Sequence, residues 1–364
     1  MMGYSSTRNL GTVLVTGGCG FVGRHLVECL LSSDPDCDIV IADINITRNR
    51  ITSSRTHYHQ IDISSFNDIN GLIESTQPRV VFHTASPEPL KSDETVYKKN
   101  TLEATGTLLE LSKNCKATRA FVMTSSVAVI DDYQTAVLHG SDSMPMLLNS
   151  RELYAAYKAR AEQLVLDSNS KDLQTATIRP CAIFGPNDQG PTTRLLGLTG
   201  SGAARMQFGD GANLFDWVYV SNVAHAHVLA ASKLLDPASV GIGGESFIVT
   251  NDEEITFWGF VRQLGSAIGN HVDAATVWSV PVWLIFHVAL LSEMVVWMVS
   301  LGSRKSTLYR ASVMECTWQR TYSIDKAKQR LGYKPVVSLE DGINLTSQWW
   351  LEEMAEKQKL AWSQ

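Results

Sequence analysis

Short apolar runs alternate with longer stretches of helical periodicity in the first half of the chain. The apolar runs are rich in β-branched residues and lie at residues 12–16, 38–42, 79–83, 119–124 and 175–179. The stretches of helical periodicity lie between them, at residues 21–31, 93–113 and 150–167. Runs that are apolar almost throughout suit strands buried on both faces, which is typical of parallel sheets covered by helices. The pattern therefore predicts an α/β fold with a doubly wound parallel sheet.

This alternation weakens after about residue 180, where glycine-rich loops become more frequent. We expect a dinucleotide-binding domain over residues 1–180 and a smaller substrate-binding region over residues 181–364. No internal repeat and no linker rich in proline, serine and glycine separates the two parts. The smaller region is therefore expected to be interleaved with the first domain.

A late apolar segment, residues 280–301, has 22 residues and one carboxylate, Glu293, and is followed by Arg304, Lys305 and Arg310. Its length is near that of a bilayer-spanning helix. A buried core helix is the alternative, because a carboxylate inside a membrane is costly. A single crossing would separate residues 321–364, which have the pattern of folded amphipathic chain, from the first domain. We therefore expect a helix or helical hairpin that dips into one leaflet.

Composition and charge narrow the function classes. The chain is 44% hydrophobic with a formal net charge of −6 and no long basic run, so nucleic acid is not expected as a partner. The six cysteines show no CxxC pair, and the HYH and HAH stretches supply too few convergent ligands, so no metal site is expected. The polar N-terminus lacks the apolar core of a secretory signal, and reduced thiols in a cytosolic environment are favoured.

The stretch VTGGCGFVG, residues 15–23, lies between the first predicted strand and the first predicted helix. Gly17, Gly20 and Gly23 permit a tight turn, close approach of the backbone to a pyrophosphate, and close packing of the helix on the sheet. Asp43 ends the second predicted strand, where a carboxylate accepts hydrogen bonds from ribose hydroxyls and repels a 2′-phosphate. The sequence therefore favours NAD as cofactor, while Arg48 keeps NADP open.

Tyr154 and Lys158 are four residues apart in a predicted helix, so their side chains share one face, whereas Tyr157 points about 100° away from Lys158. An unperturbed phenol has a pKa of ~10, and a nearby ammonium favours the phenolate that a general base requires. A packed tyrosine beside a surface lysine is the alternative, because the spacing alone is common.

The stretch TSSVAV begins at Thr124, at the end of a predicted strand. Strand ends at one edge of a doubly wound sheet face the ligand crevice, so Ser126 can hydrogen-bond a substrate oxygen. Serines at strand ends more often cap a turn, and this feature gains meaning only with the other two motifs. Ser125 replaces Ser126 if the strand register differs by one residue.

Taken in this order, the glycine loop, Asp43, TSS and YxxxK resemble the extended short-chain dehydrogenase/reductases, which have a Rossmann fold. Further stretches are similar to the 3β-hydroxysteroid dehydrogenase branch, and within it to the sterol-4α-carboxylate 3-dehydrogenases. These stretches are HTASP (83–87), KNTLEATGTLLEL (99–111), RPCAIFGPND (179–188), FDWVYVSNVAHAHVLAA (215–231) and NDEEITFWGF (251–260). The late segment that opens with PVW is similar to the membrane-associated segment of that branch. The resemblance covers about residues 12–341.

The resemblance implies a role for each residue that matches the family's motifs. The implied catalytic residues are Ser126, Tyr154 and Lys158. The implied NAD-binding residues are Gly17, Gly20, Phe21, Val22 and Gly23 of the loop, Asp43 for the ribose, Asp62 for the adenine, Ala85, Lys158 and Pro180. Asn100 matches an asparagine of the central helix whose role is less settled. Two positions depart from the pattern: Leu153 replaces a frequent proline, and Tyr157 replaces a small hydroxyl residue.

The resemblance also implies a reaction. It implies NAD-dependent oxidation of the 3β-hydroxyl of a sterol or triterpenoid, with loss of CO₂ where the adjacent carbon carries a carboxyl group. Ser126 would hold the alcohol oxygen, Tyr154 would take its proton, and Lys158 would lower the phenol's pKa and bind the nicotinamide ribose. A place on the cytosolic face of the endoplasmic reticulum membrane and a homodimer are further implications.

Four alternatives stay open at this stage. Three are enzymes: a 3β-hydroxysteroid dehydrogenase/isomerase, a terpenoid ketoreductase and a sugar-nucleotide epimerase, although an epimerase has no need of the apolar segment. The fourth is a non-catalytic NAD-binding regulator, against which the presence of the complete acid–base set argues.

Overall fold

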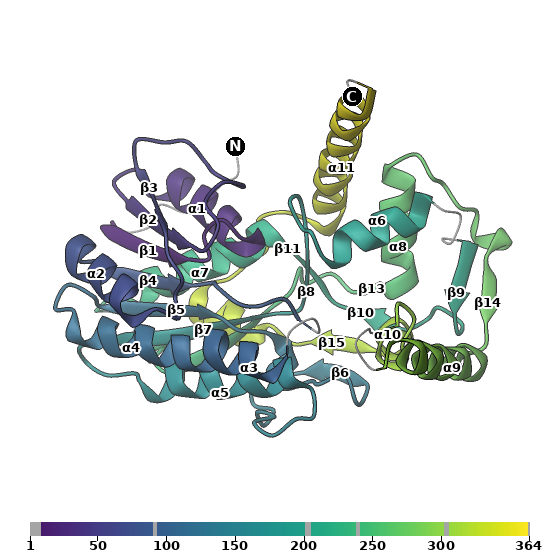
Figure 1. Ribbon diagram of the computed structural model, residues 1–364, viewed down its shortest axis with the longest axis horizontal. Coiled ribbons are helices and arrows are strands. Elements are labelled where there is room, and N and C mark those ends of the chain that lie inside the picture. The colour runs from purple at the N-terminus through teal and green to yellow at the C-terminus, as the bar shows by residue number, and fades with distance from the viewer. Residues whose placement is uncertain (1–8, 90–92, 201–204, 238–240, 302–305, 363–364) are drawn as a thin grey trace.

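The fold is described from a computed structural model that covers residues 9–89, 93–200, 205–237, 241–301 and 306–362. Its central sheet has seven strands, all paired in parallel (Figure 1). Their spatial order is β12 (Glu245–Val249), β7 (Gln174–Pro180), β5 (Ala120–Thr124), β4 (Val80–His83), β1 (Thr12–Thr16), β2 (Asp38–Asp43) and β3 (Thr56–Gln60). The order reverses between β1 and β4, at the switch point where such folds bind their ligands.

Helices cover both faces of this sheet, as predicted for a doubly wound fold. One layer contains α1 (Phe21–Ser33) and α7 (Val220–Leu234), and the other contains α2 (Phe66–Thr76), α4 (Ala104–Asn114) and α5 (Leu153–Asp167). Along β1, Val13 and Val15 join the core under α1 and α7, whereas Leu14 joins the core under α2 and α4. This alternation follows from the period of two along a strand.

Helical periodicity at residues 93–113 gives three consecutive pieces and not one regular helix. They are α3 (Glu94–Tyr97), the π-helical η1 (Lys98–Glu103) and α4. A π-helical turn shifts the register of the side chains that follow it and is frequent near functional sites. Asn100 lies within this turn, in a segment that packs against α5.

The smaller region is built mainly from the second half of the chain. Its main sheet has β13 (Ile255–Thr256), β10 (Leu214–Phe215), β15 (Arg320–Tyr322) and β6 (Val137–Gly140), in that order. Two further pairs are β11 (Trp217–Tyr219) with β8 (Ala182–Phe184), and β14 (Trp278–Val280) with β9 (Met206–Phe208). The helices of this region are α6 (Pro191–Gly200), α8 (Phe257–Ala267), α9 (Val282–Ser300), α10 (Arg310–Thr317) and α11 (Leu339–Trp362). The described residues also contain the 3₁₀ turns η2 (Val127–Val129) and η4 (Ala274–Thr276) and the π-helical η5 (Ala327–Leu331).

The two regions exchange elements. β6 comes from the first half of the chain but pairs with β15, whereas β12 and α7 come from the second half but belong to the central sheet and its helical layer. The interleaving expected from the sequence takes this form. The boundary at residue 180 stays a prediction, because β12 lies beyond it and pairs with β7.

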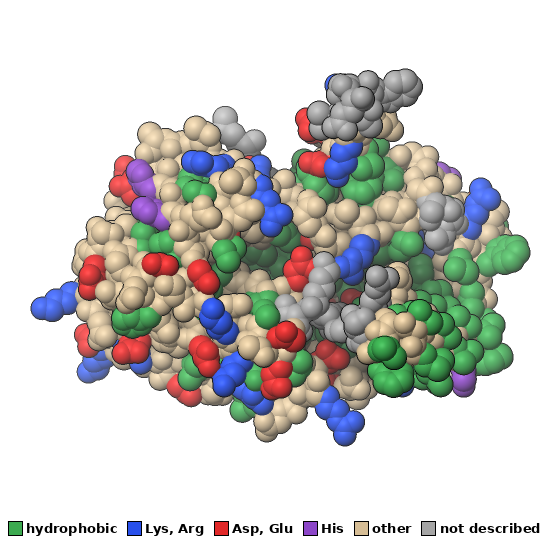
Figure 2. Space-filling model, viewed as in Figure 1, with side chains coloured by type: hydrophobic (Ala, Val, Ile, Leu, Met, Phe, Trp, Pro, Cys, Tyr) green, Lys and Arg blue, Asp and Glu red, His purple; other side chains and the backbone are tan. Residues whose placement is uncertain are grey.

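The late apolar segment forms α9, and the buried-core alternative is wrong for it. Only Ile285 and Ala289 of this helix are buried, and hydrophobic side chains gather on its outer surface (Figure 2). Arg310, the first residue of α10, pairs with Glu293 at 2.8 Å and offsets its charge, while Arg304 and Lys305 lie outside the described residues. Beyond α10 the chain returns to the body through β15, so residues on both sides of α9 belong to one folded unit.

Candidate active site

The glycine loop joins β1 to α1 in a conformation that leaves no room for side chains. Gly17 has a φ of 70°, and its amide donates to the carbonyl of Ala42 at 2.7 Å. A Cβ on Gly17 would lie 2.6 Å from the Cα of Ala85, and one on Gly23 would lie 2.1 Å from the carbonyl oxygen of Gly17. Backbone atoms are thus the contact surface of this loop, because glycine alone fits both positions.

The start of α1 presents donors without an internal acceptor. Gly20 is its N-cap, no side chain caps the helix, and its first turn contains no acidic residue. One turn further, Nε and Nη1 of Arg24 are buried without a hydrogen-bond partner. Free amides at a positive helix end suit an anion. The loop, with Phe21 and Val22 in that first turn, therefore fits the pyrophosphate of a dinucleotide.

The predicted cofactor residues lie at the carboxyl ends of neighbouring strands. Asp43 ends β2, and its two carboxylate oxygens accept from the amides of Cys19 and Asn45, each at 3.0 Å. Asp62 follows β3, and hydrogen bonds from the hydroxyl and amide of Ser64 lower its pKa. Ala85 follows β4, and Pro180 ends β7. The parallel sheet thus brings all four to the edge where the glycine loop lies.

Ser126 and Tyr154 are hydrogen-bonded to each other. Oγ of Ser126 also accepts from the amide of Ala128 at 3.1 Å, which leaves its own proton for the phenol. Burial raises the pKa of Tyr154 to about 12, and the hydrogen bond with Ser126 opposes that rise. In this structure Tyr154 is therefore a neutral phenol at physiological pH, held by a serine that stabilises its ionised form.

Lys158 lies one turn along α5 from Tyr154 and is 3% exposed. Its Nζ donates to the carbonyl of Thr124 at 2.9 Å, and burial lowers its pKa to about 8. The lysine charge in turn helps to lower the pKa of His83 and His227, which are neutral and hydrogen-bonded to threonines. The lowering of the tyrosine pKa by Lys158 stays a prediction, since the influence opposing burial here comes from Ser126.

A buried carboxylate, Glu162, completes this helix face and was missed by the sequence reasoning. It is fully buried and accepts from the hydroxyls of Ser125 and Thr177 and, at 2.8 Å, from Nε of Arg179. Its charge raises the pKa of Lys158 against the effect of burial. The spacing of four residues from Lys158 could have identified it. Because Ser125 is engaged here, the geometry favours Ser126 as the serine beside Tyr154.

Tyr157 points away from this set. Its hydroxyl donates to Glu94 of α3 at 3.0 Å, and the guanidinium of Arg160 lies over its ring. Burial and the hydrogen bond with Glu94 raise its pKa. Its role in this structure is to pack α5 against α3, while the ring of Tyr97 packs edge-on against Tyr154.

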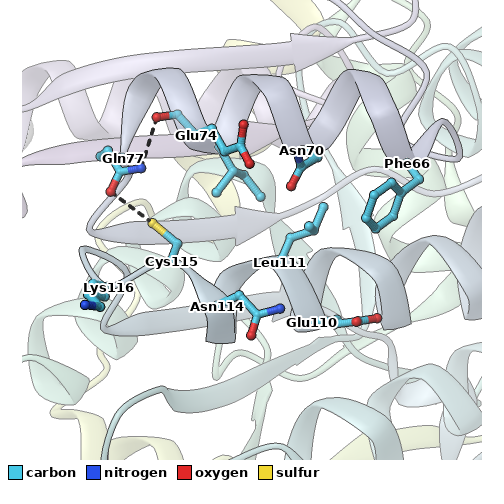
Figure 3. A pocket seen from close by; sticks show the side chains of 10 residues that line it. Phe66, Asn70, Glu74, Gln77, Glu110, Leu111, Asn114, Cys115 and Lys116 are labelled. Atoms are coloured by element: carbon cyan, nitrogen blue, oxygen red, sulfur yellow. Dashed lines mark hydrogen bonds between the residues drawn. The ribbon is translucent and has the colours of Figure 1, made fainter.

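A cavity of about 490 Å³ is lined by none of these residues (Figure 3). It lies between α2 and α4 and is lined by side chains such as Phe66, Gln77 and Cys115, whose Sγ donates to Gln77. Within the ranges that the structure describes, no group of three or more histidine, cysteine, aspartate or glutamate side chains could hold a metal ion. The candidate active site is therefore the edge of the central sheet and not this cavity.

Comparison with known proteins agrees with this geometry. The seven-stranded parallel sheet, the glycine loop at its switch point and the serine–tyrosine pair beside a buried lysine define an extended short-chain dehydrogenase/reductase. The chain belongs to the 3-beta hydroxysteroid dehydrogenase/isomerase family, whose profile matches residues 14–282. The resemblance seen in the sequence is confirmed.

Curated relatives match along nearly the whole chain. The chain is 35% identical to the sterol-4-alpha-carboxylate 3-dehydrogenase, decarboxylating, of Saccharomyces cerevisiae, over 93% of this chain and 98% of that protein. It is 30% identical to the mouse protein of the same name, over 92% and 89%. It is 31% identical to the 3beta-hydroxysteroid-dehydrogenase/decarboxylase isoform 2 of Arabidopsis thaliana, over 95% of this chain and 63% of that protein.

Solved structures share the fold at lower identity. A UDP-glucose 4-epimerase of Thermotoga maritima superposes with a TM-score of 0.70 at 20% identity, over 94% of this chain and 99% of that one. A UDP-glucose 4-epimerase of Thermus thermophilus, solved in complex with NAD, gives 0.66 at 21% identity, over 93% and 98%. At this identity these likenesses show the shared fold.

Proposed function

We propose that this protein oxidises the 3β-hydroxyl of a 4α-carboxysterol with NAD and that the product loses CO₂. The main support is the hydrogen bond between Ser126 and Tyr154, together with the buried Lys158 one helical turn from Tyr154. The named activity of the yeast and mouse relatives, each aligned over at least 89% of its length, supports the choice of substrate.

In this proposal each side chain has one task. When bound, NAD supplies the hydride acceptor and the positive charge of its nicotinamide ring. Ser126 holds the alcohol oxygen, and Tyr154, as phenolate, takes the hydroxyl proton. Lys158 has one donor on the carbonyl of Thr124 and two more that can reach the nicotinamide ribose and the phenolate. Its charge then favours the ionised form of Tyr154.

Loss of CO₂ needs no further catalytic group. Oxidation at C3 places a ketone beside the carbon that bears the carboxylate. When the bond from C4 to the carboxylate breaks, its electron pair moves into the ketone and forms an enolate oxygen. Ser126 and Tyr154, now protonated, both donate toward that oxygen, so the same pair that accepts the alcohol stabilises the enolate. A proton from solvent then adds to C4, and the enolate becomes the 3-ketone.

Asp43 is proposed to set the preference for NAD. We expect Asp43→Asn to lower the ratio of kcat/KM for NAD to that for NADP by about 10- to 100-fold, because a charged hydrogen-bond acceptor is lost and repulsion of a 2′-phosphate is removed. Asparagine keeps one oxygen for the amide of Cys19 in the glycine loop, while the hydrogen bond from the amide of Asn45 is lost. The measurement is NADH and NADPH formation under initial-rate conditions, and an unchanged ratio contradicts the assignment. Adding Arg48→Ala tests whether that arginine accepts the phosphate.

The apolar surface of α9 is proposed to bind a membrane. Its exposed side chains include Trp283, Leu291, Trp297 and Val299, and an 18-residue window of the helix has a mean hydropathy of 2.0 with 11% of its residues buried. A solvent-exposed apolar surface of this size is unfavourable in water and favourable in a lipid interface. Because the chain returns to the body through β15, α9 would lie in one leaflet and deliver a lipophilic sterol from it.

We expect Leu291→Gln with Trp297→Gln to weaken binding to phosphatidylcholine vesicles by at least about 10-fold, since two apolar side chains of ~2 kcal/mol each are removed. The measurement is co-flotation of the purified protein with vesicles. Leu138→Gln, on β6, is the matched control, because Leu138 is as exposed as Leu291, at 58% and 60%. Equal flotation of all three proteins contradicts the role of α9.

The location that follows is the endoplasmic reticulum membrane with the body on the cytosolic side. All six cysteines are free thiols, which suits a reducing compartment. A homodimer stays a prediction from the family resemblance.

One assay separates the remaining alternatives. The purified protein is incubated with NAD and matched 3β-hydroxysteroids with and without a 4α-carboxyl group, and NADH and CO₂ are followed. NADH and CO₂ in equal amounts from the carboxylated compound support the proposal. NADH without CO₂ indicates a dehydrogenase/isomerase or a ketoreductase run in reverse. No NADH from any compound contradicts sterol oxidation and leaves a non-catalytic NAD-binding protein.

A further inference from the structure

Arg320 is a fully buried arginine whose hydrogen bonds are only partly made. It lies on β15 and is 2% exposed. Its Nη1 donates to Asp131 Oδ2, which also accepts from the hydroxyl of Tyr322 at 2.6 Å. Its guanidinium lies over the ring of Tyr133, 4.6 Å from the centroid. Nε and Nη2, by contrast, are buried and have no partner.

The two free nitrogens form one complete edge of the guanidinium. Nε and Nη2 point their N–H bonds in the same direction, in the fork that matches the two oxygens of a carboxylate. Charged donors that are buried and unpaired destabilise the fold, so such an edge calls for an acceptor. Asp131 cannot serve, because it is bonded to Nη1 on another side of the group.

A small cavity lies at Arg320, and its lining includes a direct chain neighbour of Ser126. Its volume is about 30 Å³, and Val127, Cys181, Tyr133 and Arg320 are among its lining residues. Val127 directly follows Ser126, and Cys181 directly follows Pro180, the residue expected beside the nicotinamide. Tyr133 is close enough to Tyr154 for the charge of one phenol to raise the pKa of the other. The cavity therefore borders the place where the substrate alcohol would lie.

We infer that the free edge of Arg320 binds the carboxylate of the substrate and so selects carboxylated sterols for oxidation. This inference rests on the proposed function. In a 3β-hydroxy-4α-carboxysterol the hydroxyl and the carboxylate are on adjacent carbons. A substrate whose hydroxyl contacts Ser126 and Tyr154 therefore carries its carboxylate to the neighbouring cavity, where it pairs side-on with Nε and Nη2.

The other charged groups at the cavity are compatible with an anion. Burial raises the pKa of Asp216 to about 7 and also raises that of Glu315, because it disfavours the ionised form of both acids. Arg194 adds a second positive charge near Glu315. The negative charge of Asp131 is offset by its ion pair with Arg320 and by the hydrogen bond from the hydroxyl of Tyr322. An entering carboxylate thus meets the free guanidinium edge, and burial disfavours the ionised form of the two acids beside it.

The size of the cavity fits the anionic head and not the sterol body. A volume of about 30 Å³ holds about two water molecules, whose oxygens a carboxylate can replace. Glu315, on the cavity wall, belongs to α10, which packs against the apolar α9 through Val313, Ile285 and Ala289. The wall on that side is thus continuous with the proposed membrane-binding helix, from which the sterol skeleton would arrive.

The test compares two substrates on wild type and Arg320→Lys. The substrates are a 4α-carboxy-3β-hydroxysteroid and the same steroid without the carboxyl group, with NADH formation as readout. Lysine keeps a positive charge for Asp131 but lacks the two-pronged edge. We expect kcat/KM for the carboxylated steroid to fall about 100-fold, mainly through KM, and that for the other steroid to change less than about 3-fold. An equal loss for both steroids overturns the inference and leaves Arg320 a structural residue.

Arg179→Lys is the matched control. Arg179 is a second buried arginine, also 2% exposed, but its Nε binds Glu162 and its Nη1 lies 3.8 Å from Asp142. We expect this variant to affect both steroids by the same factor, since it has no role at the cavity. A selective loss of the carboxylated steroid in Arg179→Lys as well overturns the assignment to Arg320.

A binding measurement keeps the inference testable if turnover fails or the variant does not fold. A 3-deoxy-4α-carboxysteroid and its methyl ester are titrated into wild-type protein with NAD, with tryptophan fluorescence as readout. We expect the acid to bind at least about 30-fold more tightly than the ester. Equal affinity for acid and ester overturns the inference even if the 3β-hydroxysteroids are oxidised normally. Selective binding of the acid, with no NADH formed from the 3β-hydroxysteroids, contradicts the proposed oxidation and not the role of Arg320.

Discussion

Tyr154→Phe is expected to lower kcat for alcohol oxidation by about 10³-fold or more, because no other hydroxyl in the described site can take the proton in its place. Ser126 is hydrogen-bonded to Tyr154 and to the amide of Ala128, and a serine hydroxyl is too weak a base at neutral pH. NAD binding should be retained, since the glycine loop and Asp43 do not contact this phenol in the described contacts. The measurements are initial rates and NAD titration by thermal stabilisation.

Tyr157→Phe is the matched control for that prediction. The substitution removes the same hydroxyl from the same helix but only breaks the hydrogen bond with Glu94. We expect a change of less than about 3-fold in kcat and a small loss of stability, of the order of 1 kcal/mol. If Tyr157→Phe were inactive and Tyr154→Phe active, the assignment of the catalytic tyrosine would be reversed.

The tyrosine assignment could be made from sequence because it depends on local geometry. A spacing of four residues places Tyr154 and Lys158 on one helical face whatever surrounds the helix. The glycine loop is local in the same sense, since the turn and the first helix are continuous in the chain. Five of the seven strands in the central sheet were also predicted, because their apolar runs are characteristic of buried parallel strands.

The missed strands lacked that signal. β3, with the sequence THYHQ, lies at the edge of the sheet and consists of exposed and half-buried residues, so it has no apolar run. β12, ESFIV, lies in the second half of the chain and pairs with β7 across about 70 residues of sequence. Its place in the central sheet is a tertiary property, as is the exchange of β6 into the smaller region.

Site properties that depend on tertiary contacts were likewise out of reach. The sequence predicts a phenol whose pKa is lowered by Lys158, but burial raises the pKa of Tyr154 to about 12 and the serine opposes it. The free edge of Arg320 depends on Asp131, which is 189 residues away in the chain. Motifs supply the reacting groups, whereas their electrostatic environment comes from elements that meet only in the fold.

Glu162 is the clearest case of such an environment, and Glu162→Gln is expected to reduce the free energy of unfolding by about 3–5 kcal/mol. The carboxylate is fully buried, and Arg179, 2% exposed, has its Nε on it at 2.8 Å. Glutamine fills the same space but keeps only one oxygen, whereas Ser125 and Thr177 donate to different oxygens of the carboxylate. The loss therefore reports the missing charge together with one hydroxyl acceptor. Urea denaturation at pH 7 measures it. Asp167→Asn, the same change at an exposed position of α5, should cost less than about 0.5 kcal/mol.

The pH dependence of that difference carries a second signature. Burial holds the pKa of Lys158 at about 8 in the folded protein, below its ordinary value of 10.5, so the cost of burying the ammonium is fully present below pH 8 and disappears as pH rises to 10.5. Glu162 raises that pKa, so its loss lowers the folded pKa further and increases the cost at pH 7. The stability gap between wild type and Glu162→Gln should therefore narrow between pH 7 and pH 10, without closing, because Arg179 stays charged. A gap that is constant with pH would mean that Glu162 stabilises Arg179 alone and leaves Lys158 unaffected.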